Sequence, residues 1–235
     1  SRGIAVVMDI VHSHSVDNEA EGLSLFDGRE DLYFYKGSQG RHPAWGSRCF
    51  DYGKSETKYF LLCNCKFWME EYHLDGFRFD GVTSMLYWDH GLGKDFVGYD
   101  NYFNAGVDEN AVTYLALAAM LVKEMNPDAI TIAEDMSGMA GLAAPFASGG
   151  LGFDFRMAMG VADHWIKWLK EKTDDEWSMG EIWWELTNKR SDEKTISYAE
   201  CHDQALVGDK TLIFRLIDKD MYTSMNTGSK SIVVD

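Results

Sequence analysis

An arginine and an aspartate lie within GFRFDG, residues 76–81, a segment that otherwise has the pattern of a buried β-strand. Side chains alternate along a strand, so Arg78 and Asp80 share one face while Phe77 and Phe79 share the other. The phenylalanines can pack outward against helices, and the charged pair then points into the space that the strand encloses. Desolvation can cancel the attraction within a buried ion pair, so such a pair is poor evidence of a purely stabilising role. We therefore interpret Arg78 and Asp80 as part of a functional site.

Acidic or imidazole side chains also follow the other strand-like segments. The segments concerned end in DIVHSH (Asp9, His12, His14), in AED (Glu134, Asp135) and in ECHD (His202, Asp203). A single acid at a strand end is usually a turn or capping residue. Four such strand ends are harder to explain in that way, because the carboxyl ends of parallel strands meet on one face of a β/α barrel. The sequence therefore predicts that these groups converge on one pocket.

Carboxylates without a nucleophilic serine or cysteine favour glycoside chemistry. In that chemistry one acid acts as nucleophile and a second as proton donor, and an arginine beside the nucleophile keeps it ionised. The proton donor must start neutral, so we expect burial and nearby carboxylates to raise its pKa. A zinc site built on His12 and His14 is the alternative. It is less favoured because no second clear pair of ligands appears.

The composition excludes some partners. The chain has 235 residues, of which 46% are hydrophobic, and a formal net charge of −16. This charge argues against nucleic acid and against an anionic membrane surface, since both need clustered Lys and Arg. A neutral polysaccharide would not be repelled. The four cysteines form no CxxC pair, which favours free thiols in an intracellular enzyme: Cys49, Cys63, Cys65 and Cys201.

The elements that must position these groups alternate along the chain. Hydrophobic patterning predicts strands over residues 3–11, 129–135, 152–159 and 195–201, besides the strand that ends at Asp80. It predicts helices over residues 55–72, with Ser55 as N-cap, and over 108–125, 162–172 and 177–188, a short alanine-rich helix after Asp135, and a helical tail after Lys210. Alternation of this kind indicates a parallel sheet with helices outside it. Barrel and doubly wound sheet both remain open, although no glycine-rich phosphate motif follows the first strand.

Four motifs then carry a resemblance to a known family. DIVHSH, GFRFDGVTSM, TIAEDMSG and YAECHDQ, in this order, resemble the four signature regions of the α-amylase superfamily. Longer stretches, among them GGLGFDFRMAMG and WGSRCFDYG, are similar to its branching enzymes of eukaryotic type. The resemblance implies an α/β fold, a partial (β/α)₈ barrel containing approximately strands 3 to 7. It also implies that residues 1–235 are a catalytic barrel domain incomplete at both ends, without the family's N-terminal glucan-binding module and C-terminal β-domain.

The resemblance also assigns roles to single residues. It implies that Asp80 is the nucleophile, that Glu134 is the general acid/base and that Asp203 stabilises the transition state. The residues expected to bind substrate are Asp9, His14, Arg78 and His202, with Arg78 also orienting Asp80. No cofactor and no metal are expected.

The implied activity is cleavage of an α-1,4 bond in a glucan such as glycogen or starch and transfer of the chain to a 6-hydroxyl. The implied location is the cytoplasm or, for a starch enzyme, a plastid. An amylase-type hydrolase and an inactive glucan-binding chain are the alternatives.

The sequence departs from the family pattern at a few positions. Thr83 and Ser84 occupy the place of the Lys-His pair of hydrolytic amylases, and Cys201, Gly46 and Arg215 replace the usual serine, aspartate and tryptophan. None of these changes touches the three expected acids. An open part-barrel leaves strand edges unpaired. We therefore expect the chain alone to be poorly stable and inactive.

Overall fold

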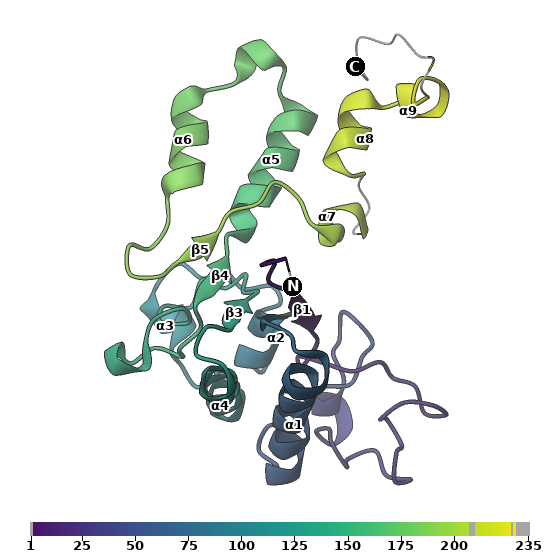
Figure 1. Ribbon diagram of the computed structural model, residues 1–235, viewed down its shortest axis with the longest axis vertical. Helices are drawn as coiled ribbons and strands as arrows, with labels where there is room; N and C mark the ends of the chain where they lie inside the picture. Colours follow the sequence, from purple (N-terminus) through teal and green to yellow (C-terminus); the bar gives the residue numbers. More distant parts are fainter. Residues whose placement is uncertain (1, 207–209, 227, 229–235) are drawn as a thin grey trace. The chain divides into compact units, whose positions relative to one another are not determined.

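The computed structural model of the protein describes residues 2–206, 210–226 and 228 (Figure 1). The chain forms two compact units: Ser1–Met157 together with Arg190–Thr195, and Ala158–Lys189 together with Ile196–Asp235. The first unit contains most of the sheet and the large hydrophobic core. The second consists mainly of helices.

One sheet contains the strands in the order in which they occur along the chain. They are β1 (Val7–Ile10), β2 (Gly76–Phe79), β3 (Ile130–Ala133), β4 (Phe155–Met157) and β5 (Thr195–Ile196). The first four strands pair in parallel. A doubly wound sheet reverses its strand order at a switch point. The order here does not reverse over the part of the chain that the structure describes, which is the winding expected of a β/α barrel.

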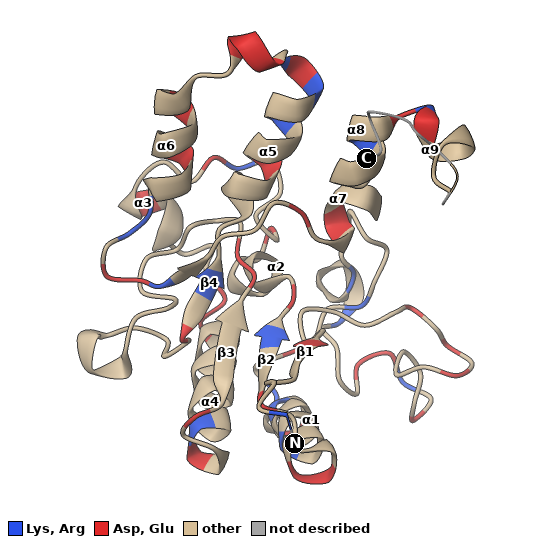
Figure 2. Cartoon of the chain, turned by 45° about the horizontal axis from the view of Figure 1, so that its top comes forward, with Lys and Arg blue, Asp and Glu red and all other residues tan. Residues whose placement is uncertain are grey.

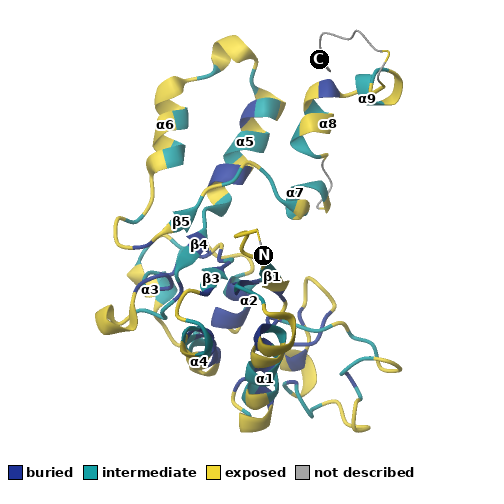
Figure 3. Ribbon diagram, in the orientation of Figure 1, coloured by how far each residue is buried: buried dark blue, intermediate teal, exposed yellow. Residues whose placement is uncertain are grey.

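The helices of the first unit contribute to its hydrophobic core. They are α1 (Ser55–Tyr72), α2 (Val82–Leu86), α3 (Tyr99–Tyr102) and α4 (Glu109–Met125), with 3₁₀ turns η1 (Gly37–Gly40) and η2 (Phe146–Ser148). Phe77 and Phe79 of β2 are fully buried in the core, together with Leu61 of α1 and Leu115 of α4. Figure 3 shows that α1 and α4 each have buried and exposed faces. The predicted outward packing of the two phenylalanines is confirmed.

The second unit contains α5 (Met159–Glu171), η3 (Asp174–Glu176), α6 (Met179–Thr187), α7 (His202–Leu206), α8 (Leu212–Ile217) and α9 (Asp220–Thr223). Helix α5 packs against α6 through Trp168, which is buried and whose indole N–H donates to Glu181 at 3.4 Å. Lys172 also pairs with Glu181 at 2.6 Å. Among the described residues, no helix combines the length and the apolar character needed to cross a membrane.

Several sequence predictions were wrong in detail. Ser55 does not cap α1, because Lys54 occupies the N-cap position and makes no side-chain capping bond. Asp108, by contrast, caps α4 by accepting from the N–H groups of Asn110 and Ala111. The alanine-rich helix expected after Asp135 is absent from the described chain between β3 and β4, where turns and the short η2 are found.

The strand predicted over residues 195–201 is also much shorter than expected. It ends at Ile196, and residues 197–201 contain no regular element. His202 and Asp203 therefore do not directly follow a strand. They form the first turn of α7 instead.

Candidate active site

The register of the sheet gathers four charged residues on one face. Asp9 pairs with Arg78 across β1 and β2, and Phe79 pairs with Ala133 across β2 and β3. The ladder continues past β3, since the N–H of Glu134 donates to the carbonyl of Phe79 at 3.0 Å. Residues paired in register share a face, and so do residues two apart on one strand. Arg78, Asp80, Asp9 and Glu134 therefore lie on the face opposite to the packed phenylalanines.

The guanidinium of Arg78 joins the three carboxylates. Its Nη1 lies 3.2 Å from Asp9 and 3.1 Å from Asp80, and its Nη2 lies 3.3 Å from Glu134. The side chains of Arg78 and Glu134 are 9% and 12% exposed, and that of Asp9 is 50% exposed. Figure 2 shows β2 as a basic segment beside the largely uncharged β3. One planar cation thus holds the expected nucleophile and the expected acid/base at neighbouring nitrogens.

Glu134 is fixed further by the turn that follows Asp80. The backbone N–H of Gly81 donates to Oε2 of Glu134 at 2.7 Å. Gly81 has φ +63°, in the left-handed region that favours glycine. A Cβ at this position would meet Oγ of Ser13 at 2.8 Å. Only glycine allows the turn to bring its N–H this close to the carboxylate without displacing Ser13.

His14 stands beside this group, as predicted from the DIVHSH motif. Burial lowers the pKa of His14 below its ordinary value, and the charge of Asp80 partly opposes this effect. A neutral imidazole is thereby favoured, which can donate or accept a hydrogen bond. The ring of His14 lies 4.8 Å from the half-exposed indole of Trp45, which stacks on His42 at 3.9 Å. Trp45 was not among the predicted site residues, because nothing in its spacing separates it from a core aromatic.

His12 lies away from this face, and its ring is hydrogen-bonded within the core. Its Nε2 bonds to Asn64 at 3.0 Å, its Nδ1 bonds to the hydroxyl of Tyr114, and burial lowers its pKa to about 4. Both ring nitrogens are thus occupied by core residues and are not free to bind a metal beside His14. The alternative of a zinc site on His12 and His14 is therefore wrong. Over the described residues, the one grouping of three possible metal ligands is Cys201, His202 and Asp203.

Asp203 and His202 belong to the second unit. The thiol of Cys201 donates to Oδ2 of Asp203 at 3.1 Å, and Nε2 of His202 lies 3.3 Å from Oδ1. The N–H of Cys201 donates to the side-chain oxygen of Gln204 at 2.7 Å. Asp203 is thus oriented by its own turn. Its predicted role beside the acids of the first unit stays a prediction.

Asp135 does not join the acids around Arg78, although it directly follows Glu134. It is buried, and its carboxylate lies 2.5 Å from Nη2 of Arg156 on β4. Arg156 pairs in register with Ala133, so it lies on the face opposite to Arg78. The expectation that both acids after β3 face one pocket was therefore wrong.

Comparison with known proteins is consistent with this geometry. No family model matches the chain. The chain is 56% identical over 227 residues to a 1,4-α-glucan-branching enzyme of Aspergillus oryzae, and 56% identical over 225 residues to that of Rhizophagus irregularis. It is 55% identical over 227 residues to that of Felis catus. These matches cover 95–96% of the chain.

The chain is a homologue of the 1,4-α-glucan-branching enzymes. It spans about a third of the length of these relatives, 32–33%. The structure is also similar to that of an α-amylase from Anoxybacillus, with a TM-score of 0.58 over 92% of this chain and 45% of the other, at 16% identity. The fold is accordingly that of part of an α-amylase-type (β/α)₈ barrel, as the sequence predicted.

Proposed function

We propose that this chain carries the catalytic carboxylates of a 1,4-α-glucan-branching enzyme. The proposal rests on one observation above all: Arg78 brings Asp80 and Glu134 together on one face of a barrel-type sheet. Homology to branching enzymes over nearly the whole chain supports the same activity. The proposed substrate is an α-1,4-glucan such as glycogen, amylose or amylopectin.

In the first half of the proposed reaction, Glu134 donates a proton to the oxygen of an α-1,4 bond while Asp80 attacks the anomeric carbon. The downstream chain leaves, and a covalent β-glucosyl–enzyme remains. Arg78 holds both acids in place, and the N–H of Gly81 orients Glu134. A retaining mechanism of this kind needs carboxyl groups about 5–5.5 Å apart.

In the second half, Glu134 acts as base toward the 6-hydroxyl of another glucan chain. The oxygen of that hydroxyl attacks the anomeric carbon, and the bond to Asp80 breaks. The new bond is an α-1,6 branch. Two inversions give net retention. His14 and Asp9, at the rim of the face, would bind hydroxyls of the reacting glucose, and His202 and Asp203 would contribute from α7. No cofactor is needed for either step.

Product analysis separates branching from hydrolysis. Amylose is incubated with the protein expressed from its complete reading frame, and both α-1,6 linkages and reducing ends are counted. New α-1,6 linkages with no net rise in reducing ends support the proposal. A rise in reducing ends without branches identifies a hydrolase. The Asp80→Asn variant is the matched control, because it removes the nucleophile and keeps the volume of the side chain.

The inactive alternative has its own test. A non-catalytic glucan-binding chain would bind glucan equally well with and without the substitution Asp80→Asn and would cleave or transfer glucan in neither form.

We also propose that residues 1–235, made alone, do not branch glucan, because the acids of the two units then lack the rest of a closed barrel. Branching by the isolated chain would contradict this expectation.

We place the enzyme in the cytoplasm, with a plastid as the alternative for a starch enzyme. The relatives described above come from two fungi and an animal, organisms without plastids. Cell fractionation with an antibody against this chain would test the location.

A further inference from the structure

The two consecutive acids after β3 form ion pairs with two different arginines. Glu134 lies 3.3 Å from Arg78 on one face of the sheet, and Asp135 lies 2.5 Å from Arg156 on the other. Figure 2 shows basic segments on both β2 and β4. Because adjacent residues of an extended chain point to opposite faces, fixing Asp135 also fixes the direction in which Glu134 points.

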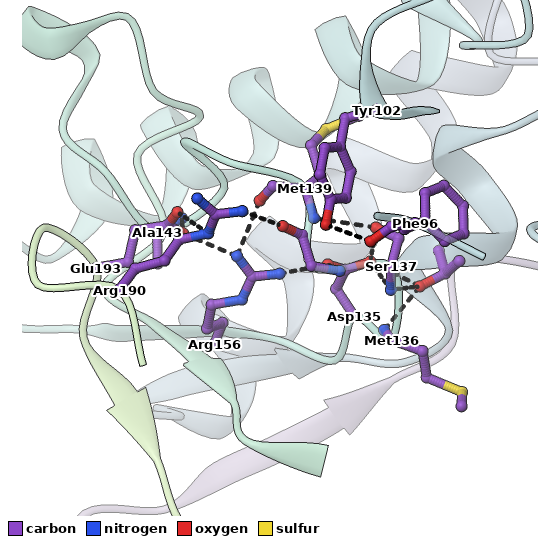
Figure 4. Close-up of polar contacts among 12 residues, drawn as sticks. Phe96, Tyr102, Asp135, Met136, Ser137, Met139, Ala143, Arg156, Arg190 and Glu193 are labelled. Carbon is purple, nitrogen blue, oxygen red and sulfur yellow. Dashed lines mark hydrogen bonds and ion pairs between the residues drawn. The ribbon is translucent and has the colours of Figure 1, made fainter. Parts of the chain in front are cut away.

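The carboxylate of Asp135 is bound from several sides (Figure 4). Besides Arg156, it accepts from the hydroxyl of Thr83 at 2.6 Å and from that of Ser137 at 2.7 Å. The N–H groups of Ser137 and Gly138 bind it at 3.1 and 2.9 Å. Its side chain is 0% exposed. A buried charge held by this many donors keeps one geometry, because losing any donor leaves polar groups unpaired.

Thr83 connects this cluster to the strand that carries the nucleophile. It lies three residues after Asp80, in the first turn of α2. Its hydroxyl oxygen accepts from the N–H of Met136 at 2.8 Å and of Ser137 at 3.2 Å, while its hydroxyl proton goes to Asp135. The backbone also ties the two segments together, since the N–H of Val82 donates to the carbonyl of Glu134 at 2.9 Å.

Glu193 holds the far end of the same network. It accepts from the N–H groups of Gly141 and Ala143, both at 2.9 Å, and pairs with Arg156 at 3.1 Å. These contacts fix the loop that follows the site, but they lie further along the chain than the residues next to Glu134. Glu193 is therefore a matched control: its side chain is equally buried and shares Arg156, but its hydrogen bonds go to a different stretch of backbone.

We infer that Thr83 and Asp135 are positioning residues that set the orientation of Glu134 toward the bond to be cleaved. This inference rests on the function proposed above. Neither residue contacts the reacting atoms. Both act through the backbone of residues 134–137, which they hold against the turn after Asp80.

The test uses donors with two different leaving groups. Thr83→Val keeps the shape of the side chain and removes its hydroxyl, whereas Thr83→Ser keeps the hydroxyl. Initial rates of donor cleavage are measured on amylose and on an α-maltooligosyl fluoride, whose fluoride leaves without protonation. A poorly placed acid/base slows the first donor far more than the second. A displacement of about 1 Å can cost about 100-fold in rate.

We expect Thr83→Val to lower kcat/KM on amylose by about 10- to 100-fold and kcat/KM on the fluoride by less than about 3-fold, because this ratio reports the steps up to the glycosyl-enzyme and not the later attack of an acceptor that Glu134 activates. Thr83→Ser should stay within about 3-fold of the unaltered protein on both donors. Glu193→Gln should lower the thermal midpoint but slow both donors by the same factor. Asp135→Asn should reproduce the leaving-group dependence of Thr83→Val more strongly.

Other outcomes would overturn the inference. They are an equal loss on both donors in Thr83→Val, no rescue in Thr83→Ser, or an unchanged kcat/KM on amylose. Because cleavage of the donor is the readout, the result does not depend on whether the glucosyl group passes to a glucan or to water. A protein that cleaves but never branches would contradict the proposed function and still decide the role of Thr83.

Discussion

Arg78 and Glu134 meet at 3.3 Å across two neighbouring parallel strands, although they lie far apart along the chain. The same guanidinium contacts Asp80 at 3.1 Å through its other terminal nitrogen. The two expected catalytic acids are thus held by one rigid, planar cation. This arrangement makes the site sensitive to the shape of the cation as well as to its charge.

Arg78→Lys is expected to lower kcat by about 100-fold, because an ammonium group cannot reach both acids through a fixed fork. Steady-state kinetics on amylose would measure the loss. Arg29→Lys is the control, since Arg29 is 64% exposed and pairs with Asp27 near the surface, where ion pairs contribute little. Activity of Arg78→Lys within about 3-fold of the unaltered protein would contradict the expectation that the planar guanidinium is needed to hold both acids.

Gly81→Ala is expected to destabilise the protein more than Gly93→Ala. Both glycines have positive φ, +63° and +66°, so both substitutions add backbone strain of about 1 kcal/mol. Only at Gly81 would the new Cβ also meet Ser13, at 2.8 Å, whereas nothing lies within 4 Å at Gly93. The difference between the two thermal midpoints measures the crowding beside the site. Equal midpoints would show that the turn can widen without cost.

The stability of the protein should fall as the pH drops from about 6.5 toward 4, in part because of His12. Burial lowers the pKa of His12 from 6.5 to about 4 in the folded state. The unfolded chain therefore binds a proton in this window that the folded chain does not, and stability is lost as the pH falls through it. The full effect is about 3 kcal/mol, and it is absent above the ordinary pKa of histidine.

His12→Asn should flatten this dependence, although it also removes bonds to Tyr114 and Asn64 and lowers stability at neutral pH. His73→Asn is the matched control, because His73 is exposed at the end of α1 and meets solvent before and after unfolding. Urea unfolding of the three proteins at about pH 7, 6, 5 and 4.5 would measure the slopes. If the dependence of stability on pH is unchanged in His12→Asn, other groups cause the loss of stability at low pH.

The sequence predicted the arrangement of side chains on β2 well, and for a physical reason. Strand alternation alone places Arg78 and Asp80 together and sends Phe77 and Phe79 to the core, because the period of a strand is fixed. Parallel pairing places the strand ends at one edge. What alternation cannot give is the register between strands, which decides that Asp9 lies beside Arg78. That pairing became visible only in the structure.

Other features depended on contacts between segments far apart in the chain. Asp135 is an acid like its neighbour Glu134, but Arg156 binds it on the other face. His12 and His14 are alike in sequence, yet Tyr114 and Asn64 hold one in the core. The strand predicted over residues 195–201 forms only at Thr195–Ile196, because the alternation beyond these two residues is weak. TISYAEC places a tyrosine and a glutamate where a buried strand would have apolar residues.

The most direct test of the account is to trap the covalent intermediate. Glu134→Gln cannot activate an acceptor, so an α-maltooligosyl fluoride should glycosylate the nucleophile and leave it occupied. Mass spectrometry of peptides from the labelled protein should find a glucosyl adduct on Asp80, and none in the double variant that also carries Asp80→Asn. An adduct on another residue, or none while fluoride is still released, would contradict the central claim that Asp80 is the nucleophile and Glu134 the acid/base.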